Sequence, residues 1–141
     1  MTKNPLSPLF KKLISLSAKA GKKAYAPYSN LHVGAALETV RGNVFSGCNV
    51  ENASFGLTCC AERNAIFQAI REEGPGMKIR AIAISSDSKY PIPPCGACRQ
   101  VIAEFISRDK TGTTVIFLSA EGMVTPRIES LLPGFFELKE Q

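Results

Sequence analysis

The chain has 141 residues, of which 45% are hydrophobic and 21% charged, a composition typical of a globular protein with a buried core. No apolar run approaches the roughly 20 residues that a membrane span needs, so we expect no membrane partner. The net charge is +5, but the lysines and arginines are scattered and form no dense block interleaved with aromatics. Composition therefore gives no reason to expect nucleic acid as a partner.

The chain's first predicted element is an amphipathic helix. Residues 1–37 contain no acidic side chain, which a transit peptide would share. The lysine pairs Lys11-Lys12 and Lys22-Lys23 interrupt the apolar core of a signal peptide. Apolar residues recur at helical spacing: Leu6, Leu9, Phe10, Leu13 and Ile14. We therefore predict a helix that begins at Asn4-Pro5 or Ser7-Pro8, rather than a cleaved leader.

Alternating strands and helices are predicted for the rest of the chain. We expect strands at 33–40, 43–50, 78–85, 113–118 and 123–128, helices at 60–71 and 97–107, a loop at 52–58 and a short helix at 128–133. Arg41-Gly42 signals a hairpin, and Gly74-Pro75-Gly76 ends a helix. A hairpin followed by β-α-β-α-β predicts an α/β fold with helices covering a mixed five-stranded sheet. No linker or repeat interrupts it, so we expect one domain over residues 1–141.

The cysteine content indicates a compartment. There are five cysteines, an odd number, and no secretory signal, so a disulfide framework is not expected. A reducing cytoplasm, where thiols stay available to a metal, fits this pattern better. We therefore predict a cytoplasmic location.

Two short motifs carry the chemistry. Cys60-Ala61-Glu62 is followed downstream by Pro94-Cys95-Gly96-Ala97-Cys98. Three thiolates leave the fourth position of a tetrahedral zinc ion open, and a carboxylate next to that position can manage the protons of a bound water. The order of ligand, x, Glu and Pro-Cys-x-x-Cys is the signature of zinc deaminases. One Cys-x-x-Cys alone would also fit a redox motif or a zinc ribbon.

The motifs also predict the setting of the metal. Cys95 and Cys98 are three residues apart at a predicted helix start, so both thiols face one side, and Cys60 lies at another helix start. The positive ends of these helices favour thiolates. The alternative is a closed zinc site in a non-enzymatic module, with a fourth ligand from Cys59, Cys48 or His32.

Charge balance requires a cation near three thiolates. Together with Zn²⁺ they carry a formal charge of −1, which weakens the metal's effect on water, so groups around the sulfurs must offset it. Arg63 is the first candidate, and the role of Arg99 stays open between the same task and surface charge. Glu62 could be an ordinary first-turn glutamate. Beside an open metal position, however, we expect it to shuttle protons.

At this point the chain resembles the small, homotetrameric class of cytidine deaminases, over almost its full length. Besides the metal motifs, the resemblance rests on Ala26-Pro27-Tyr28-Ser29, Val33-Gly34-Ala35-Ala36-Leu37, Gly47-Cys48-Asn49-Val50-Glu51-Asn52-Ala53, Arg99-Gln100 and Leu131-Leu132-Pro133. It implies a three-layer fold and hydrolytic deamination of cytidine and 2′-deoxycytidine to the uridines, for pyrimidine salvage. It also implies one zinc ion per subunit, held by Cys60, Cys95 and Cys98, with attack of the zinc-bound hydroxide on C4.

The resemblance further implies roles for substrate contacts. Asn49 and Glu51 would hydrogen-bond the ribose 3′-hydroxyl, and the backbone amide of Ala61 would contact the pyrimidine. Arg63 would neutralise the extra thiolate. Each pocket would be shared between subunits, with an aromatic of the C-terminal tail reaching a neighbour's site. Phe136 matches that residue best and Phe135 is the alternative, although both could pack on their own core.

Two positions depart from the family pattern and bear on the substrate. Leu31 stands where many relatives have an aromatic that stacks on the base, and Phe55 stands where relatives often have a tyrosine. The rival substrates are a modified pyrimidine nucleoside, a nucleoside antibiotic such as blasticidin S, or a base in a polynucleotide. Cys60 argues against the last, because polynucleotide enzymes of this superfamily usually have histidine as the first ligand.

Overall fold

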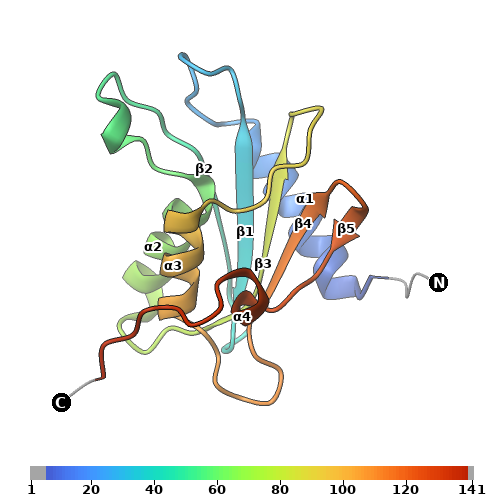
Figure 1. Ribbon diagram of the computed structural model, residues 1–141, viewed down its shortest axis with the longest axis vertical. Coiled ribbons are helices and arrows are strands. Elements are labelled where there is room, and N and C mark those ends of the chain that lie inside the picture. Colours follow the sequence, from blue (N-terminus) through green and yellow to red (C-terminus); the bar gives the residue numbers. More distant parts are fainter. Residues whose placement is uncertain (1–5, 140–141) are drawn as a thin grey trace.

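A mixed five-stranded sheet forms the centre of the computed structural model, which describes residues 6–139 (Figure 1). Its strands are β1 (Val33–Thr39), β2 (Val44–Cys48), β3 (Ile79–Ser86), β4 (Thr114–Ser119) and β5 (Gly122–Val124). They lie in the order β2-β1-β3-β4-β5. Only β3 and β4 are parallel neighbours, and the other pairs are antiparallel. The predicted mixed sheet is confirmed.

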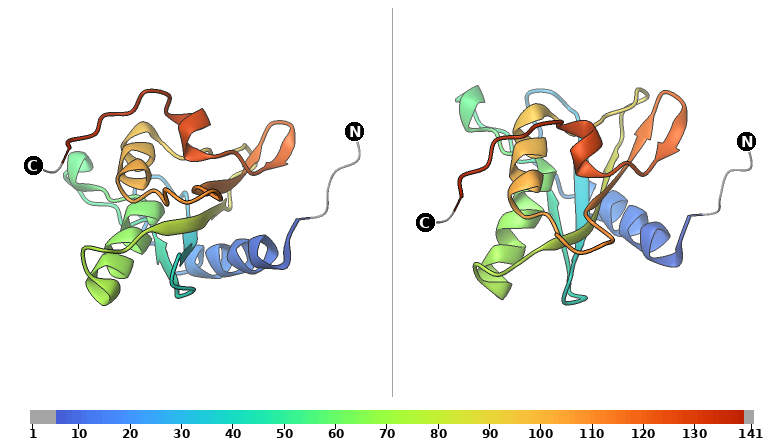
Figure 2. Two further views of the ribbon diagram at one scale, coloured as in Figure 1. Left: turned by 90° about the horizontal axis from the view of Figure 1, so that it is seen from below. Right: turned by 60° about the horizontal axis from the view of Figure 1, so that its bottom comes forward.

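Helices cover both faces of the sheet and make three layers (Figure 2). Helix α1 (Pro8–Gly21) packs on one face, and α2 (Ala61–Glu73) and α3 (Gly96–Glu104) pack on the other. A short α4 (Ile128–Leu131) lies against α3. Across residues 6–139, no helix has both the length and the apolarity to cross a bilayer.

The two faces of the sheet differ in the size of their side chains. Because successive strand residues point to opposite faces, β3 directs Ile82 and Ile84 to the α2 and α3 side and Ala81 and Ala83 to the α1 side. In β1, Ala36 likewise faces α1. The isoleucines build the larger core cluster, whereas the alanines let α1 approach the strands closely.

The helix ends follow the predicted signals. Helix α1 begins after Ser7, whose hydroxyl accepts a 3.2 Å hydrogen bond from the Phe10 amide, with Pro8 in its first turn. The start at Ser7-Pro8 is therefore confirmed, and Asn4-Pro5 lies outside the described residues. Helix α2 ends at Gly74, which has a φ of 81°, the left-handed region that glycine adopts without strain.

Several boundaries differ from the prediction, most of all the ends of α3 and β5. Helix α3 ends at Glu104 instead of Ser107, because the Phe105 carbonyl accepts from the Ile79 amide and so turns the chain onto β3. Strand β5 ends at Val124, since Pro126 lacks the amide that would extend the ladder. The predicted loop at 52–58 contains a short 3₁₀ helix, η1 (Phe55–Leu57).

Gly34 permits the tightest contact between α1 and the sheet. A Cβ at this position would lie 1.8 Å from the Ser17 carbonyl oxygen and 2.5 Å from the Gly21 amide nitrogen. Both atoms belong to the backbone of α1, so neither can rotate away. The helix can rest on β1 only because position 34 carries no side chain.

We expect Gly34→Ala to lower the free energy of unfolding by about 2 kcal/mol or more, because α1 must lift off the sheet. Chemical denaturation measures this. Gly56→Ala is the matched control, since a Cβ there meets nothing within 4 Å, and it should leave stability nearly unchanged. Equal stability of the two variants would contradict the contact.

Candidate metal centre and substrate pocket

Three cysteines meet where α2 and α3 begin. Cys60 caps the N-terminus of α2, Cys95 caps that of α3, and Cys98 lies in the first turn of α3. The three sulfurs lie within 4.8 Å of one another, and Sγ of Cys60 is 3.9 Å from Sγ of Cys95. The two motifs, separated by β3 in the sequence, therefore form one cluster.

The cluster fits a tetrahedral zinc ion with an open position. Zn–S bonds of about 2.3 Å in tetrahedral geometry separate two thiolates by about 3.8 Å, close to the observed 3.9 Å. Within residues 6–139, no further His, Cys, Asp or Glu joins these three sulfurs. In particular, Nδ1 of His32 lies 2.7 Å from Asp87 instead. The geometry offers no fourth protein ligand from His32, Cys48 or Cys59.

Strand β2 fixes the start of α2. The amides and carbonyls of Val50 and Cys59 pair at 2.9 and 3.0 Å, which extends the ladder beyond β2. The Asn64 side chain donates to the Cys48 carbonyl at 2.8 Å. At Gly47, a Cβ would lie 2.6 Å from the Ala65 amide nitrogen, so α2 approaches β2 as closely as a glycine allows. Cys60 is thereby held against the strand.

Arg99 fixes the start of α3. Its Nε donates to the Pro94 carbonyl at 2.8 Å, and its Nη1 donates to the Leu131 carbonyl at 2.9 Å. The guanidinium therefore ties the residue before Cys95 to α4. The sequence leaves open whether Arg99 donates to the sulfurs or is a surface charge. In the structure it does neither and instead joins two backbone segments through hydrogen bonds.

Arg63 provides positive charge at the thiols. Its Nη2 donates to Sγ of Cys60 at 3.4 Å, and its Nε is buried without a hydrogen-bond partner. The pKa of Cys60 falls to about 5, mainly because the Cys98 thiol donates to its sulfur and also because Arg63 does, while burial opposes the change. Donating that hydrogen bond, together with burial, raises the pKa of Cys98. Cys60 is therefore the first thiolate of the cluster.

Glu62 lies beside the cluster in a dry environment. Its side chain is 4% exposed, and burial is the main reason why its pKa is raised. The Glu62 backbone amide opposes this effect, whereas the negative charge of Cys60 adds to it. A carboxyl group that lies beside these thiols and holds its proton more tightly than usual is suited to proton transfer near neutral pH.

A pocket lies next to this end of the sheet. It has a volume of about 380 Å³, within the range of small-molecule sites, and is lined by Tyr28, Ser29, Glu51, Phe55 and Thr58. Tyr28 and Phe55 form an edge-to-face pair with ring centroids 5.8 Å apart. Ser29 and Thr58 are pocket residues that the sequence analysis did not single out, because hydroxyl residues in a polar loop carry no distinctive pattern.

Glu51 organises one wall of this pocket. Its carboxylate accepts from the Tyr28 amide at 2.9 Å, the Ser29 amide at 3.1 Å and the Ser29 hydroxyl at 2.5 Å. The hydroxyl of Ser29 is the main reason why the pKa of Glu51 is lowered, partly offset by burial, and the two amides contribute further. Glu51 therefore remains a carboxylate that holds the segment before β1 in place.

Asn49 secures the same segment closer to the sheet. Its Oδ1 accepts from the Val33 amide and its Nδ2 donates to the Leu31 carbonyl, both at 2.8 Å. These bonds hold the residues on either side of His32 in the sequence. Leu31 is half-buried against the main core. Of the three candidate substrate contacts, Glu51 lines the pocket, and Leu31 is linked to that lining because its amide donates to the Ser29 hydroxyl at 3.0 Å.

The remaining predicted residues lie at the edges of the site. Ala61 is fully buried as the first residue of α2. Phe135 packs on the main core, whereas Phe136 is 69% exposed, and its carbonyl accepts a 3.0 Å bond from the Gln100 side chain. Packing on the protein's own core therefore describes Phe135, and Phe136 stays available to a partner.

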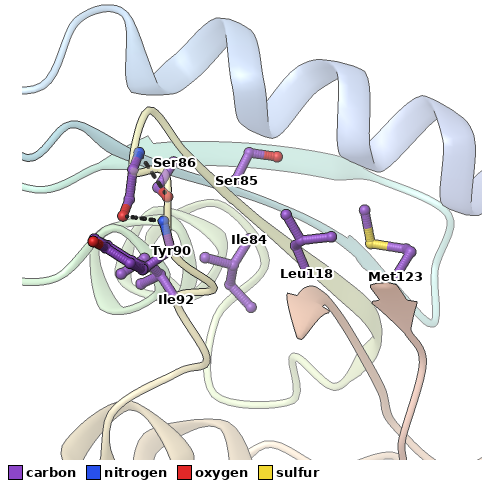
Figure 3. Close-up of a pocket in the computed structure, with 8 residues that line it drawn as sticks. Ile84, Ser85, Ser86, Tyr90, Ile92, Leu118 and Met123 are labelled. Atoms are coloured by element: carbon purple, nitrogen blue, oxygen red, sulfur yellow. Dashed lines mark hydrogen bonds between the residues drawn. The ribbon is translucent and has the colours of Figure 1, made fainter. Parts of the chain in front are cut away.

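Another hollow lies beside the C-terminal end of β3 (Figure 3). Ile84, Leu118 and Met123 line it from β3, β4 and β5, and Tyr90 and Ile92 lie at one end. Its lining contains no cysteine, histidine or carboxylate. None of the predicted site residues belongs to it, so it offers no groups for metal or proton chemistry.

Comparison with known proteins agrees with this geometry. The model of the cytidine and deoxycytidylate deaminase zinc-binding region matches residues 9–113. The cytidine deaminase of Halalkalibacterium halodurans is 45% identical over 130 residues, covering 91% of this chain and 94% of that protein. That of Sporosarcina psychrophila is 42% identical over 131 residues, covering 92% of each.

Solved structures give the same result. The crystal structure of the cytidine deaminase from Burkholderia pseudomallei has a TM-score of 0.78 and 45% identity, covering 89% of this chain and 98% of that one. The cytidine deaminase from Mycobacterium tuberculosis has a TM-score of 0.76 and 33% identity, covering 92% and 98%. The chain therefore belongs to the zinc-binding cytidine and deoxycytidylate deaminase family and is an enzyme of the cytidine deaminase type.

Proposed function

We propose that this enzyme hydrolyses cytidine and 2′-deoxycytidine to uridine and 2′-deoxyuridine, for pyrimidine salvage. The observation that carries the proposal is the buried Glu62 carboxyl beside the three sulfurs of Cys60, Cys95 and Cys98. Residues 1–141 would form one catalytic domain. The cysteine pattern of the sequence supports a cytoplasmic location.

The three thiolates would hold one zinc ion per subunit. When bound, zinc supplies the Lewis acidity that makes water a nucleophile at neutral pH. Three thiolates weaken that acidity, and the guanidinium of Arg63, which donates to Cys60, returns positive charge to the sulfurs. Arg63 would thus adjust the charge of the site while contacting no substrate.

Glu62 would move the protons of the reaction. Its carboxylate takes a proton from the attacking water and passes it to the pyrimidine ring nitrogen N3. It then takes the second proton of that water from the oxygen now bonded to C4 and delivers it to the amino group, so that the bond from C4 to the amino nitrogen breaks and ammonia leaves. Burial supports this role, because a carboxyl with a raised pKa accepts and returns protons near neutral pH more readily than an exposed one.

Asn49 and Glu51 retain the capacity to bind a ribose hydroxyl. A carboxylate has about four acceptor positions, and Glu51 uses three of them on Tyr28 and Ser29. The Asn49 side chain keeps one N–H group beyond its bond to Leu31. One free acceptor and one free donor suit the 3′-hydroxyl. The Ala61 amide, at the N-terminus of α2, would contact the base, and Leu31 would cover it.

We further propose that the sites are completed by self-association into a homotetramer. Phe136 and Phe55 are 69% and 74% exposed, so a neighbouring copy of the chain could cover both rings. Phe136 would enter a neighbour's pocket from the tail that Gln100 holds.

The substrate range is a separate matter. Leu31 offers no π face and Phe55 no hydroxyl, so a modified pyrimidine nucleoside or blasticidin S is the second candidate. A kinetic panel of these compounds with cytidine, 2′-deoxycytidine, free cytosine and adenosine distinguishes them.

We expect Cys60→Ser, Cys95→Ser and Cys98→Ser to lose bound zinc, because each removes one of only three protein ligands. Elemental analysis of purified protein should show about one zinc per subunit in the unaltered chain and less than about a third of that in these variants. Cys48→Ser and Cys59→Ser are matched controls that should retain it. Zinc loss in a control, or zinc retained without Cys98, would contradict the ligand set.

Glu62→Gln should keep its zinc and lose turnover by a factor of about 10² or more, because the amide cannot relay a proton. The loss of cytidine absorbance measures the rate, and released ammonia confirms the reaction. Glu72→Gln, an exposed position of the same helix, serves as the control and should retain normal activity. Near-normal rates in zinc-loaded Glu62→Gln would remove Glu62 from this role.

Mixing two inactive variants in equal amounts tests the shared site. Phe136→Ala keeps its own Glu62, and Glu62→Gln supplies an intact Phe136. After subunit exchange, a site is complete only where a subunit with intact Glu62 adjoins a neighbour with intact Phe136. In an equal mixture, this should restore activity at about a quarter of the sites of the symmetric assembly. No recovery, with exchange verified by mass, would place Phe136 in its own subunit's site or outside any site.

A further inference from the structure

At the end of the β1–β3 pairing, side chains as well as backbone groups form the hydrogen bonds between the two strands. The final strand pair in register is Val33 with Ser86, and one position further the Asp87 amide donates to the His32 carbonyl at 3.2 Å. The Asp87 carboxylate makes two further hydrogen bonds to His32. Its Oδ1 accepts from the His32 amide at 3.0 Å, and its Oδ2 lies 2.7 Å from Nδ1 of the imidazole. We refer to His32 and Asp87 as the bracket.

The bracket binds its two residues more firmly than an ordinary surface ion pair. An exposed pair contributes little on its own, since salt and side-chain entropy weaken it. Here, however, one carboxylate engages a backbone amide and a ring nitrogen at once, and bonds to a charged acceptor are stronger than neutral ones. The amide and then the imidazole of His32 are the main reasons why the pKa of Asp87 is lowered.

On the β1 side, the bracket continues into the pocket wall. His32 lies between Leu31 and Val33, which are both held by Asn49. Before Leu31 the chain turns at Asn30, with a φ of 56°, and reaches Tyr28 and Ser29 on the Glu51 carboxylate. Leu31 also packs on the main core, so a fixed His32 backbone helps to hold the Leu31 side chain against that core.

On the β3 side, the bracket continues into the segment that carries Cys95. The Ser86 hydroxyl accepts from the Ser88 amide at 3.3 Å, and the Ser88 hydroxyl accepts from the Tyr90 amide at 3.0 Å (Figure 3). After Tyr90 come three prolines, at positions 91, 93 and 94, which fix φ. The connection from Asp87 to the metal ligand is thus short and stiff.

We propose that Asp87 is a positioning residue for nucleoside binding: through His32 it sets Leu31 and the pocket wall relative to the segment that carries the metal ligand Cys95. This positioning role rests on the proposed function, in which the pocket holds a nucleoside. Asp87 does not contact the substrate. Its removal should therefore weaken binding and leave the chemistry at Glu62 intact.

Asp87→Ala tests the proposal in the zinc-loaded enzyme. We expect KM for cytidine to rise about tenfold while kcat changes less than about twofold, the pattern of lost binding shared by ground and transition states. Asp87→Asn should largely restore KM, because its amide can still accept from the His32 backbone and donate to the ring. Zinc content should be unchanged in both.

Asp109→Ala is the matched control. The Asp109 carboxylate likewise accepts hydrogen bonds from loop amides, those of Thr111 at 2.8 Å and Gly112 at 3.2 Å. Asp109, however, lies in the connection from α3 to β4, at the opposite end of the sheet. KM should not change in this variant. An unchanged KM in Asp87→Ala, or equal losses of kcat, zinc and thermal stability in both alanine variants, would overturn the positioning role.

Hydrogen exchange gives a reading that does not depend on the substrate. In Asp87→Ala, the peptide covering 26–33 should exchange about tenfold faster, because its anchoring bonds open locally, while the exchange of α2 stays the same. Unchanged exchange at 26–33 would overturn the proposal even if KM rises. If the unaltered enzyme does not turn over cytidine, the proposed function fails, and this exchange still decides whether the bracket holds the wall.

Discussion

The proposed metal centre depends on bringing three cysteine sulfurs together at two helix N-termini. Neither Cys60 nor Cys95 makes a side-chain hydrogen bond to the first turn of the helix it caps, so the first amides of α2 and α3 are not satisfied by cap side chains. Those amides and the helix dipoles favour thiolates, and Arg63 adds a full charge at Cys60. Without this convergence, three adjacent thiolates would repel one another, and the cluster could not hold a metal.

Close packing makes the convergence possible. Gly47 lets the first turns of α2 rest directly on β2, and Arg99 ties the start of α3 to α4. On the opposite face, Gly34 and the alanines of β1 and β3 do the same for α1. Helices α1 and α2 are therefore set at a fixed height on the sheet by missing side chains, a constraint that a flexible core of larger residues would not impose.

Much of this was accessible from the sequence, because the signals are local. Each cysteine motif, the order of strands and helices along the chain, and the start of α1 follow from spacing, periodicity and capping residues within a few positions of one another. The role of Arg99 and the bracket could not be predicted in the same way. Asp87 meets His32 across 55 positions, and Arg99 meets Leu131 across 32, so only the folded chain brings them together. The end of α3 was missed for the same reason, because the bond from the Ile79 amide to the Phe105 carbonyl decides it, whereas Pro126, which ends β5, is a local signal.

Catalysis and recognition are assigned to different parts of the fold. The thiols and Glu62 lie in the first turns of α2 and α3, rigid elements that are packed on the core. The pocket wall consists of loops before β1 and after β2, which are held by Asn49, Glu51 and the bracket through hydrogen bonds. A loop residue such as Leu31 or Phe55 can therefore change without moving a metal ligand. Under the proposed function, this separation would let positions 31 and 55 vary while the cysteines and Glu62 keep their places.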